Sequence, residues 1–443
     1  MAPSPFDGRV AEMTVRTPVA LPTPAVRPVP SALPAPPAGP HHDAGSTGLE
    51  RGRAPLAPEA PAALPALTAQ AGQAGPAELT GPAAPITAPI TAGGTVPDRL
   101  TDRHGRTVRD LRLSITDRCN LRCTYCMPAA GLEWLPTPSL LTTTEIGRLA
   151  RLAVERLGVE RIRLTGGEPL LRRDLEEIVA AVAGLRTRRG VKPDIGLTTN
   201  GLGLDRRAVG LREAGLDRVN VSIDTLDPAE YARVTRRDRL DGVLRGVAGA
   251  QAAGLSPIKI NAVAMPGGLD ERAPRLLGEC LRRGWSLRFI EHMPLGPRES
   301  WRAEDVVGAQ QVLEALNAAG FELHARGRPD RRPAAVWDVA AGADREGAYP
   351  AGTVGIIASV TAPFCSDCDR TRLTADGRVM TCLFSAQETD LRGPMRAGAS
   401  DDDLIRIWAG ATWYKPLAHG TDAPGRYGAD FVRPSRTMSA IGG

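Results

Sequence analysis

Three cysteines near the first third of the sequence have the spacing of metal–sulfur ligands. Cys119, Cys123 and Cys126 form a C-x3-C-x2-C pattern within one short segment. Three thiolates from one loop can each bind one iron of a [4Fe–4S] cluster and leave the fourth iron open for a small molecule. Zinc usually takes four protein ligands, and no fourth Cys or His lies nearby in the sequence. The pattern therefore favours a cluster with an open iron, over which Tyr125 is expected to stand.

A second group of three cysteines lies towards the C-terminus. Cys365 and Cys368 bracket a tight C-x2-C turn, and Cys382 follows a dipeptide typical of a hairpin turn, Asp376-Gly377. The hairpin arms, 371–374 and 378–382, would carry the third thiolate back toward the first two. The group fits a second cluster with an open iron. The alternative is a structural zinc ion that a distant residue such as His419 completes.

Basic side chains accompany these cysteines and indicate an anionic ligand. Arg370 and Arg372 follow Cys368 at alternate positions, so they share one face of an extended chain. Arg112 and Arg163 lie in two apolar segments, and their planar guanidinium groups suit phosphates and purine edges. Lys259, one of three lysines in the chain, lies inside another apolar segment. A buried ammonium needs an anionic partner, which is either a ligand or a structural ion pair.

The elements that must position these residues alternate between strand and helix patterns from residue 110 onward. Strands are predicted at 111–116, 161–165, 195–198, 219–223, 258–264 and 286–291. Helices are predicted at 144–157, 174–185, 205–214, 240–253 and 271–283, and again at 309–319 and 402–409. Strands separated by helices form a parallel sheet with right-handed crossovers. Six such units are two short of a closed barrel, so the sequence predicts an α/β fold with a partial barrel and a smaller α+β domain after it.

A polar or glycine-rich segment follows each predicted strand. These segments are TDRCNLRCTYCMP (116–128), TGGEP (165–169), TTNG (198–201), SIDT (222–225), NAVAMPGG (261–268) and EHMPLG (291–296). In α/β barrels the active site lies at the carboxyl ends of the strands. Six such segments are therefore expected to meet at one face, with the first cysteine loop among them.

Composition divides the chain into three predicted parts: an extension over 1–98, the barrel over 99–300 and the second-cysteine domain over 301–443. Residues 1–98 contain 20 of the 39 prolines, which predicts a disordered extension. No secretory signal or membrane-spanning run is recognised, so we expect a cytoplasmic protein with reduced thiols. The net charge of +5 comes from scattered basic residues, which gives no indication of a nucleic-acid or membrane partner.

The motifs together resemble those of a known enzyme family. The C-x3-C-x2-C loop with an aromatic residue before its last cysteine resembles the radical S-adenosylmethionine superfamily. Residues 99–443 are similar more specifically to the GTP 3′,8-cyclase family over essentially their whole length. That resemblance is carried by SITDRCNLRCTYCMP, RLTGGEPLLRRDL, NVSIDTLD, CSDCDRTRLTADG and the terminal Gly442-Gly443 pair. It says nothing about residues 1–98.

The resemblance implies the first step of molybdenum cofactor biosynthesis, catalysed by a lyase on a partial (β/α)6 barrel with two [4Fe–4S] clusters. In that family, S-adenosylmethionine is cleaved to a 5′-deoxyadenosyl radical, which removes the 3′ hydrogen of GTP so that C3′ bonds to C8. The product is (8S)-3′,8-cyclo-7,8-dihydroguanosine 5′-triphosphate, which a pyranopterin synthase then rearranges. The family also implies a flavodoxin- or ferredoxin-like electron donor and a monomer or homodimer.

The resemblance also assigns a role to individual residues. The first cluster would be held by Cys119, Cys123 and Cys126, and the second by Cys365, Cys368 and Cys382. The S-adenosylmethionine site would be lined by Tyr125, Gly167, Ser222 and Met293. GTP would be bound by Arg112, Arg163, Thr198, Lys259, Arg370, Thr371 and Arg372. Gly442 and Gly443 would reach into the active site and take part in radical transfer.

Two alternatives remain open from the sequence. One is a radical S-adenosylmethionine maturase that acts on a peptide and has an auxiliary cluster, although such enzymes usually carry more C-terminal cysteines. The other is an arginine-rich zinc protein that binds nucleic acid. The second alternative leaves the six barrel-end segments unexplained, and with 4% aromatic residues the chain offers few side chains for base stacking.

Overall fold

The computed structural model describes residues 95–297, 300–328, 331–419, 434 and 436–442. The predicted disordered extension therefore lies outside the described residues, apart from 95–98. Within that short piece, Val96 packs against the main core. Gly443, one of the two predicted tail glycines, also lies outside the described residues. Within the described residues, no helix is long and apolar enough to cross a membrane.

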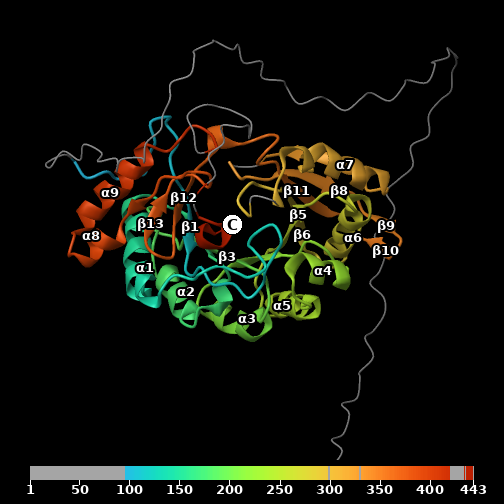
Figure 1. Ribbon diagram of the computed structural model, residues 1–443, viewed down its shortest axis with the longest axis horizontal. Coiled ribbons are helices and arrows are strands. Elements are labelled where there is room, and N and C mark those ends of the chain that lie inside the picture. The colour runs from blue at the N-terminus through green and yellow to red at the C-terminus, as the bar shows by residue number, and fades with distance from the viewer. Residues whose placement is uncertain (1–94, 298–299, 329–330, 420–433, 435, 443) are drawn as a thin grey trace, which may run out of the picture. The chain divides into compact units, whose positions relative to one another are not determined.

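Six parallel strands form the centre of the fold in chain order (Figure 1). They are β1 (Asp110–Ser114), β2 (Arg161–Thr165), β3 (Asp194–Thr199), β4 (Arg218–Ser222), β5 (Ile258–Ala264) and β6 (Ser286–Glu291). Each strand pairs in parallel with the next one. The sequence prediction of six strands is confirmed, with ends that differ by no more than two residues.

Helices on the outside of the strands supply the crossovers (Figure 1). They are α1 (Thr143–Arg151), α2 (Leu175–Ala183), α3 (Leu204–Glu213), α4 (Pro228–Thr235), α5 (Leu240–Ala252) and α6 (Leu269–Arg282). The predicted helix 144–157 is divided, because a π-helical turn over Leu152–Arg156 follows α1. Helix α4 was not predicted, yet Asp227 caps it by accepting a hydrogen bond from the Glu230 amide, and Pro228 occupies its first turn.

The C-terminal segment adds strands to both edges of this sheet. Strand β12 (Arg370–Leu373) pairs in parallel with β1, and β11 (Gly352–Ile357) pairs in parallel with β6. The sheet is completed by β13 (Arg378–Met380) and β14 (Thr389–Asp390) at one end and by β8 (Ala335–Val339) and β7 (Leu323–Gly327) at the other. A separate hairpin is formed by β9 (Gly342–Asp344) and β10 (Gly347–Tyr349). The domain boundary at residue 300 stays a prediction, and strands from both sides of it share one sheet.

The remaining helices are α7 (Ala309–Ala318), α8 (Arg392–Arg396), α9 (Asp401–Trp413) and the short α10 (Met438–Ile441). Helices α7 and α9 confirm the two predicted C-terminal helices, although α9 runs four residues further than expected. The predicted hairpin is also confirmed: β12 and β13 pair antiparallel, and Gly377 provides the positive φ of +79° that its turn requires. Helix α10, drawn in red in Figure 1, lies among the strands rather than on their outer side.

Candidate active site

The first cysteine group lies in the loop that follows β1, at the carboxyl end of the strands. Its three side chains are half-buried thiols. The loop turns on itself between the second and third cysteines, where the Cys126 amide donates to the Cys123 carbonyl at 3.0 Å. The predicted position at the carboxyl ends of the strands is therefore what the structure shows.

Glycines from two other barrel-end segments let the chain pack directly on this loop. A Cβ at Gly167 would collide with the carbonyl oxygens of Asp117 and Arg118, and one at Gly296 would collide with the Tyr125 carbonyl. The backbones approach so closely that only glycine fits. The TGGEP segment and the end of EHMPLG thus form the walls that hold the cysteine loop.

Carboxyl groups border the first cysteine group. The Tyr125 hydroxyl donates to Asp224 Oδ2 at 2.7 Å, which fixes the ring beside the loop. Glu168 is buried and accepts from the Thr199 hydroxyl at 2.6 Å and from the Asn200 amide at 2.6 Å. Burial raises the pKa of Glu168 to about 7, against these hydrogen bonds. Sequence reasoning missed Asp224 and Glu168, although both lie inside segments that it had singled out, SIDT and TGGEP.

Burial raises the pKa of the thiols of this group and disfavours their thiolate form. Burial raises the pKa of Cys126 to about 12, the neighbouring Cys119 adds to the effect, and a backbone hydrogen bond from Ser439 opposes it. Burial also raises the pKa of Cys123 well above its usual range, and Asp224 raises it further. A metal ion or cluster is needed to draw these protons off.

Of the residues assigned to the S-adenosylmethionine site, Ser222 ends β4 and Gly167 lies against the cysteine loop, both at the carboxyl end of the sheet. Met293 follows β6 and lines both the second cysteine pocket and the basic cavity described below. Met293 therefore lies where the second cysteine pocket and the basic cavity meet.

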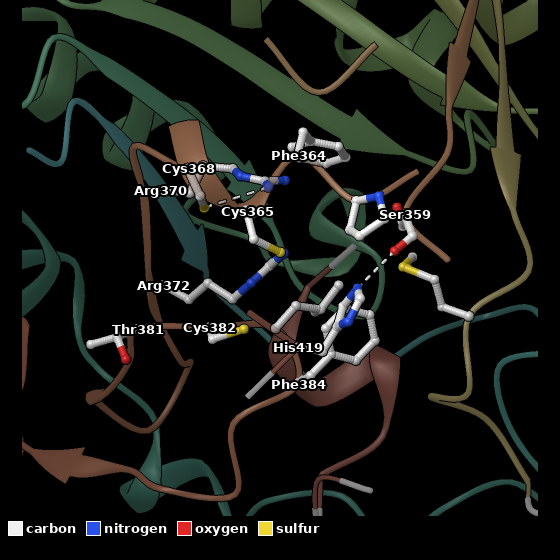
Figure 2. Close-up of a pocket in the computed structure, with 13 residues that line it drawn as sticks. Ser359, Phe364, Cys365, Cys368, Arg370, Arg372, Thr381, Cys382, Phe384 and His419 are labelled. Atoms are coloured by element: carbon white, nitrogen blue, oxygen red, sulfur yellow. Dashed lines mark hydrogen bonds between the residues drawn. The ribbon is translucent and has the colours of Figure 1, made fainter. Parts of the chain in front are cut away.

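The second cysteine group faces one pocket of about 60 Å³ (Figure 2). Cys365 begins a short 3-10 turn, Cys368 ends it, and Cys382 follows β13, so the β12–β13 hairpin brings the third cysteine back as predicted. Arg370 and Arg372 extend into the same pocket, and Arg370 Nη2 contacts Cys368 Sγ at 3.6 Å. The alternative fourth ligand, His419, also lines this pocket, where its Nε2 lies 3.1 Å from the Ser359 carbonyl oxygen.

The second cysteine group differs from the first in having cations beside one of its sulfurs. Burial alone would raise the pKa of Cys368, but Arg370 and Lys415 outweigh it and lower that pKa to about 6. Cys365 lies in the same turn, but burial raises its pKa. One thiolate of the group is thus favoured before any metal binds.

The donor sets fit iron–sulfur clusters. Each group offers three thiol sulfurs, the ligands that such clusters prefer, and leaves one iron without a protein ligand. The glycine walls hold the first loop in place, and at the second group Arg370 and Lys415 favour the thiolate form of Cys368 that a cluster binds. Within the described ranges, no three His, Cys, Asp or Glu side chains converge closely enough for a single metal ion.

A basic cavity of about 360 Å³ lies inside the sheet, next to the second cysteine pocket. Arg112 stands opposite Arg163 on β2 and opposite Arg372 on β12. Arg163 stands opposite Gly196 on β3, and Gly196 stands opposite Arg218 on β4. A Cβ at Gly196 would collide with the Arg218 guanidinium, so the glycine makes room for this row of cations.

The cavity carries a large excess of positive charge. Its lining includes ten arginines and Lys259 against Asp110, Asp194 and Asp369, which is 11 − 3 = 8 positive charges. Arg163 is buried, and its Nε and Nη1 find no hydrogen-bond partner among the described residues. Burial lowers the pKa of Arg163 well below its usual range and that of Lys259 to about 7, and neighbouring arginines add to both shifts. A polyanion would relieve this repulsion.

Most residues predicted to bind GTP line this cavity, namely Arg112, Arg163, Thr198, Lys259, Arg370 and Arg372. Thr371 does not line it. Because side chains alternate along β12, Thr371 points to the opposite face from its two arginine neighbours and is buried there. Thr198 lines the cavity, whereas the Thr199 hydroxyl is engaged with Glu168.

Sequence reasoning missed Arg218 and Arg288, which line the same cavity. Arg288 is a charged residue between apolar neighbours inside a predicted strand, the same signal that identified Lys259, and its Nε donates to Asn261 Oδ1 at 3.0 Å. Arg218 lies two positions before Asn220 on β4, so both face inward.

The chain end enters this region. Arg372 Nη1 donates to the Gly442 carbonyl. A Cβ at Gly442 would collide with the Thr165 methyl group and lie 2.7 Å from Ser114 Oγ, and its φ is +71°. With the Ser439 backbone at Cys126, the described part of the tail runs from the first cysteine group to the cations of the second.

Comparison with known sequences adds two family matches. Residues 113–279 match the Radical SAM superfamily, and residues 285–421 match the family described as Molybdenum Cofactor Synthesis C. A GTP 3′,8-cyclase of Corynebacterium glutamicum is 56% identical over 344 residues, which cover 78% of this chain and 89% of that protein. A GTP 3′,8-cyclase of Mycolicibacterium smegmatis is 53% identical over 369 residues, or 83% of this chain and 97% of that protein.

Among solved structures, Streptococcus suis SuiB bound to S-adenosylmethionine is 14% identical to this chain. It superposes with a TM-score of 0.48 over 72% of this chain and 68% of that one.

Proposed function

The chain belongs to the GTP 3′,8-cyclase family of radical S-adenosylmethionine enzymes, and we propose how its residues divide the work of that reaction. The family catalyses the first step of molybdenum cofactor biosynthesis. In that step GTP becomes 3′,8-cyclo-7,8-dihydroguanosine 5′-triphosphate, an isomer of GTP. The assignment of residues to cluster, cosubstrate and substrate below is the proposal.

Cys119, Cys123 and Cys126 hold the first [4Fe–4S] cluster, which with S-adenosylmethionine supplies a 5′-deoxyadenosyl group that abstracts hydrogen. Asp224 holds Tyr125 in place beside the cluster, and the glycine walls fix the loop. Gly167, Ser222 and Met293 would contact the cosubstrate, and the position of Gly167 and Ser222 at the carboxyl end of the sheet supports this assignment. The neighbouring carboxyl groups suit the sulfonium and ammonium charges of the cosubstrate.

GTP occupies the basic cavity. The single observation that carries this assignment is the cavity's excess of eight positive charges, with buried guanidinium nitrogens that find no partner among the described residues. A nucleoside triphosphate carries about four negative charges and presents many oxygen acceptors. Arg112, Arg163, Lys259 and their neighbours bind the phosphates, and Arg370 and Arg372 reach from this cavity into the second cysteine pocket.

Cys365, Cys368 and Cys382 would hold a second [4Fe–4S] cluster, which would supply an iron without a protein ligand for the guanine to bind. Both Arg370 and Arg372 line the cavity and the cysteine pocket, so a ligand that spans the two spaces places its phosphates and its base at opposite ends. Within the described residues the tail contacts both regions, through the Ser439 backbone at Cys126 and the Gly442 carbonyl at Arg372, and Gly442 and Gly443 would guide the ribose toward the first cysteine group.

The test is anaerobic incubation with GTP, S-adenosylmethionine and a reductant. Because the product has the mass of GTP, it is separated by chromatography. GTP deuterated at C3′ should transfer its deuterium to 5′-deoxyadenosine. Deuterium that stays on recovered nucleotide while 5′-deoxyadenosine forms would contradict the proposed reaction, and omission of S-adenosylmethionine is the control.

Metal analysis tests the two clusters and the alternatives. The proposal requires about eight irons with matching sulfide per chain, since each [4Fe–4S] cluster contributes four. Zinc without sulfide would support the zinc-protein alternative, and activity on a peptide instead of GTP would support the maturase. The flavodoxin- or ferredoxin-like donor, the downstream pyranopterin synthase, the cytoplasmic location and the monomeric or dimeric state belong to the same proposal.

A further inference from the structure

Lys415 is a buried lysine that contacts a ligand of the proposed second cluster. Its side chain lies just after α9 and is 3% exposed. The ammonium donates to the Cys368 carbonyl at 2.8 Å and to the Arg370 carbonyl at 2.7 Å, and it lies 3.4 Å from Cys368 Sγ. The three contacts use the three donors of an ammonium group and aim one of them at the sulfur.

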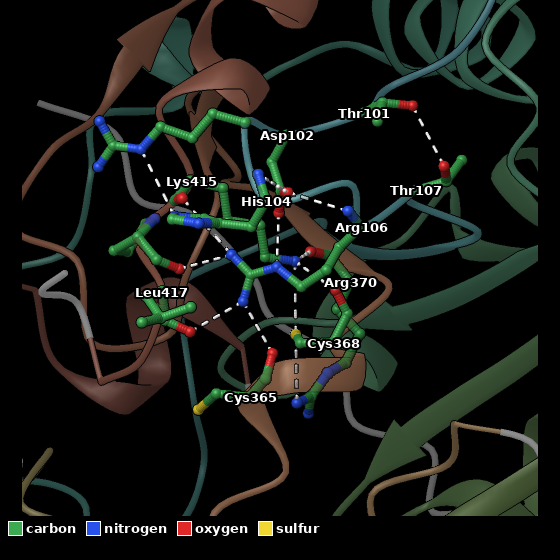
Figure 3. A network of polar contacts seen from close by, with 12 residues as sticks. Thr101, Asp102, His104, Arg106, Thr107, Cys365, Cys368, Arg370, Lys415 and Leu417 are labelled. Atoms are coloured by element: carbon green, nitrogen blue, oxygen red, sulfur yellow. Dashed lines mark hydrogen bonds and ion pairs between the residues drawn. The ribbon is translucent and has the colours of Figure 1, made fainter. Parts of the chain in front are cut away.

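A second buried cation holds the segment that carries Lys415 (Figure 3). Arg106 Nη1 donates to the Cys365 carbonyl at 2.7 Å and to the Leu417 carbonyl at 2.9 Å, and its Nη2 donates to the Pro416 carbonyl at 2.7 Å. The guanidinium is neutralised by Asp102, whose Oδ2 lies 2.6 Å from Arg106 Nε. Arg106 therefore connects the cysteine turn to the Lys415 segment through hydrogen bonds.

A buried ammonium is stable only beside an anion. The nearby carboxylate of Asp369 is already paired with Arg161. Among the described residues, the Lys415 ammonium contacts two backbone carbonyls and the Cys368 sulfur, and that sulfur is a thiolate when it binds iron. The geometry therefore makes Lys415 the partner of a metal-bound sulfur rather than of a carboxylate.

The first cysteine group is arranged differently. Its nearby cation, Arg122, points its Nη1 at the carbonyl oxygens of Cys119 and Leu121, both at 2.8 Å, and its guanidinium lies over the Trp134 ring. That arginine is engaged with the backbone and an aromatic ring. At the second group, the ammonium of Lys415 lies against the sulfur itself.

We propose that Lys415 is a positioning residue of the second cluster, whose charge and hydrogen bond at Cys368 Sγ raise the reduction potential of that cluster. Charge and hydrogen bonds at the ligand sulfurs are among the factors that set the potential of iron–sulfur clusters. Reduction makes the cluster more negative, and a buried positive charge favours that state. The inference rests on the proposed second cluster.

The experiment is a redox titration of the second cluster by electron paramagnetic resonance in the full-length enzyme. It is repeated in a Cys123→Ala background so that the second cluster alone is observed. Lys415→Met and Lys415→Gln remove the charge, and Lys415→Arg keeps it. Lys192→Met is the matched control, because Lys192 is bound to Asp217 at 2.6 Å in an unrelated part of the surface.

The expected result is that both neutral variants shift the reduced-to-oxidised ratio at a fixed potential by about tenfold toward the oxidised form, or 59 mV for one electron. Lys415→Arg should shift it much less, and Lys192→Met not at all. Neutral variants with the parent potential, or an arginine variant that shifts as much as methionine, would overturn the proposal.

Variants that lose the cluster also give an answer. Loss of the second cluster's four irons from both neutral variants, with retention in Lys415→Arg, would support a charge requirement at Cys368. Loss of the cluster from all three variants would overturn the proposal. It would mean that the second cluster requires the size and shape of the lysine side chain and not its charge. If the parent enzyme itself contains only about four irons, the second cluster is absent, and it is the proposed function that fails.

Discussion

The loop of Cys119, Cys123 and Cys126 is bordered by carboxyl groups, whereas the group of Cys365, Cys368 and Cys382 is bordered by cations. At the first group, Asp224 raises the pKa of Cys123 beyond the effect of burial. At the second, Arg370 and Lys415 lower the pKa of Cys368 to about 6 in spite of burial. Two sets of three cysteines with similar burial thus have opposite electrostatic surroundings.

The difference matches the ligands that the two groups are proposed to meet. S-adenosylmethionine carries a sulfonium and an ammonium against one carboxylate, so an acidic border suits it. GTP is a polyanion, and the cations at the second group continue into the cavity for its phosphates. The surroundings therefore separate the two sites by charge, which suits each site to the charge of one ligand and not the other.

The largest effects are expected when one cysteine is removed from each group, which tests whether the two groups have different roles. Cys123→Ala should abolish cleavage of S-adenosylmethionine, because the site at which it is reduced is lost. Cys368→Ala should retain some uncoupled cleavage but form no cyclised GTP. Release of 5′-deoxyadenosine and of product is measured for each variant.

Cys280→Ala is the matched control for these two variants. Cys280 is buried in helix α6 and is 1% exposed, as a structural side chain should be. Its loss should lower stability without removing iron. Equal residual cyclisation in Cys123→Ala and Cys368→Ala would refute the division of roles.

The tail joins the two regions, so a change in it should uncouple them. A Cβ at Gly442 would collide with Thr165 and displace the carbonyl that Arg372 binds. We expect Gly442→Ala, Gly443→Ala or a tag after Gly443 to reduce cyclisation about a hundredfold or more, since misplacement near the reacting atoms is costly. For Gly443→Ala and for the tag, iron content, GTP affinity and the melting temperature should change little.

Gly398→Ala is the control for Gly442→Ala, because it tests the cost of a positive φ without a collision at the Cβ. Gly398 has a positive φ of +89°, but a Cβ there meets no atom within 4 Å. It should cost about 1 kcal/mol of stability and leave cyclisation intact. A C-terminally tagged enzyme with full activity would show that the tail has no part in coupling.

Arg370 tests whether the cationic surroundings bind the substrate. Charge-assisted hydrogen bonds contribute about 1.5–3 kcal/mol each, so Arg370→Ala should weaken GTP affinity by about ten- to a hundredfold. Anaerobic titration with GTP measures this, and iron analysis should show both clusters in place. Arg233→Ala, on the outer helix α4, removes an exposed arginine and should leave affinity unchanged. An unchanged affinity in Arg370→Ala would exclude it from the GTP site.

Much of the fold and the grouping of the cysteines could be predicted because the signals are local. The six strands, the β12–β13 hairpin and the barrel-end motifs depend on period, turn residues and short spacings. The pairing of β12 with β1 and of β11 with β6 could not be predicted, because no local pattern specifies a partner strand hundreds or tens of residues away. Thr371 was assigned by resemblance, against the alternation along its own strand.

The positioning residues were missed for the same reason. Arg106 and the Cys365 carbonyl that it binds are 259 residues apart in the chain, and Lys415 and Cys368 are 47 apart. A lone arginine or lysine outside the predicted strands gives no sign of such a partner. Arg288 differs, because a charged residue inside a predicted strand is a usable signal, the one that identified Arg112, Arg163 and Lys259.

The smallest expected effect is a pH dependence of GTP affinity that arises from Lys259 in the basic cavity. Burial, with Arg288 next, lowers the pKa of Lys259 to about 7, so much of this side chain is neutral at pH 8 in the free enzyme. Bound triphosphate favours the ammonium and raises that pKa, so binding takes up a proton above pH 7.

The sign of the resulting pH dependence follows from this linkage. GTP affinity has its full Lys259 contribution below the free-enzyme pKa of about 7 and loses it as pH rises toward the bound-state pKa. We expect a decrease of about three- to tenfold between pH 7 and pH 9, measured by anaerobic titration, and a flatter profile in Lys259→Met. The nucleotide's own ionisation is common to both proteins, so the difference between their profiles isolates the lysine, and Lys192→Met should follow the parent. Parallel profiles for the parent and Lys259→Met would mean that this lysine keeps one charge state throughout, and that the repulsion in the cavity is already relieved without the substrate.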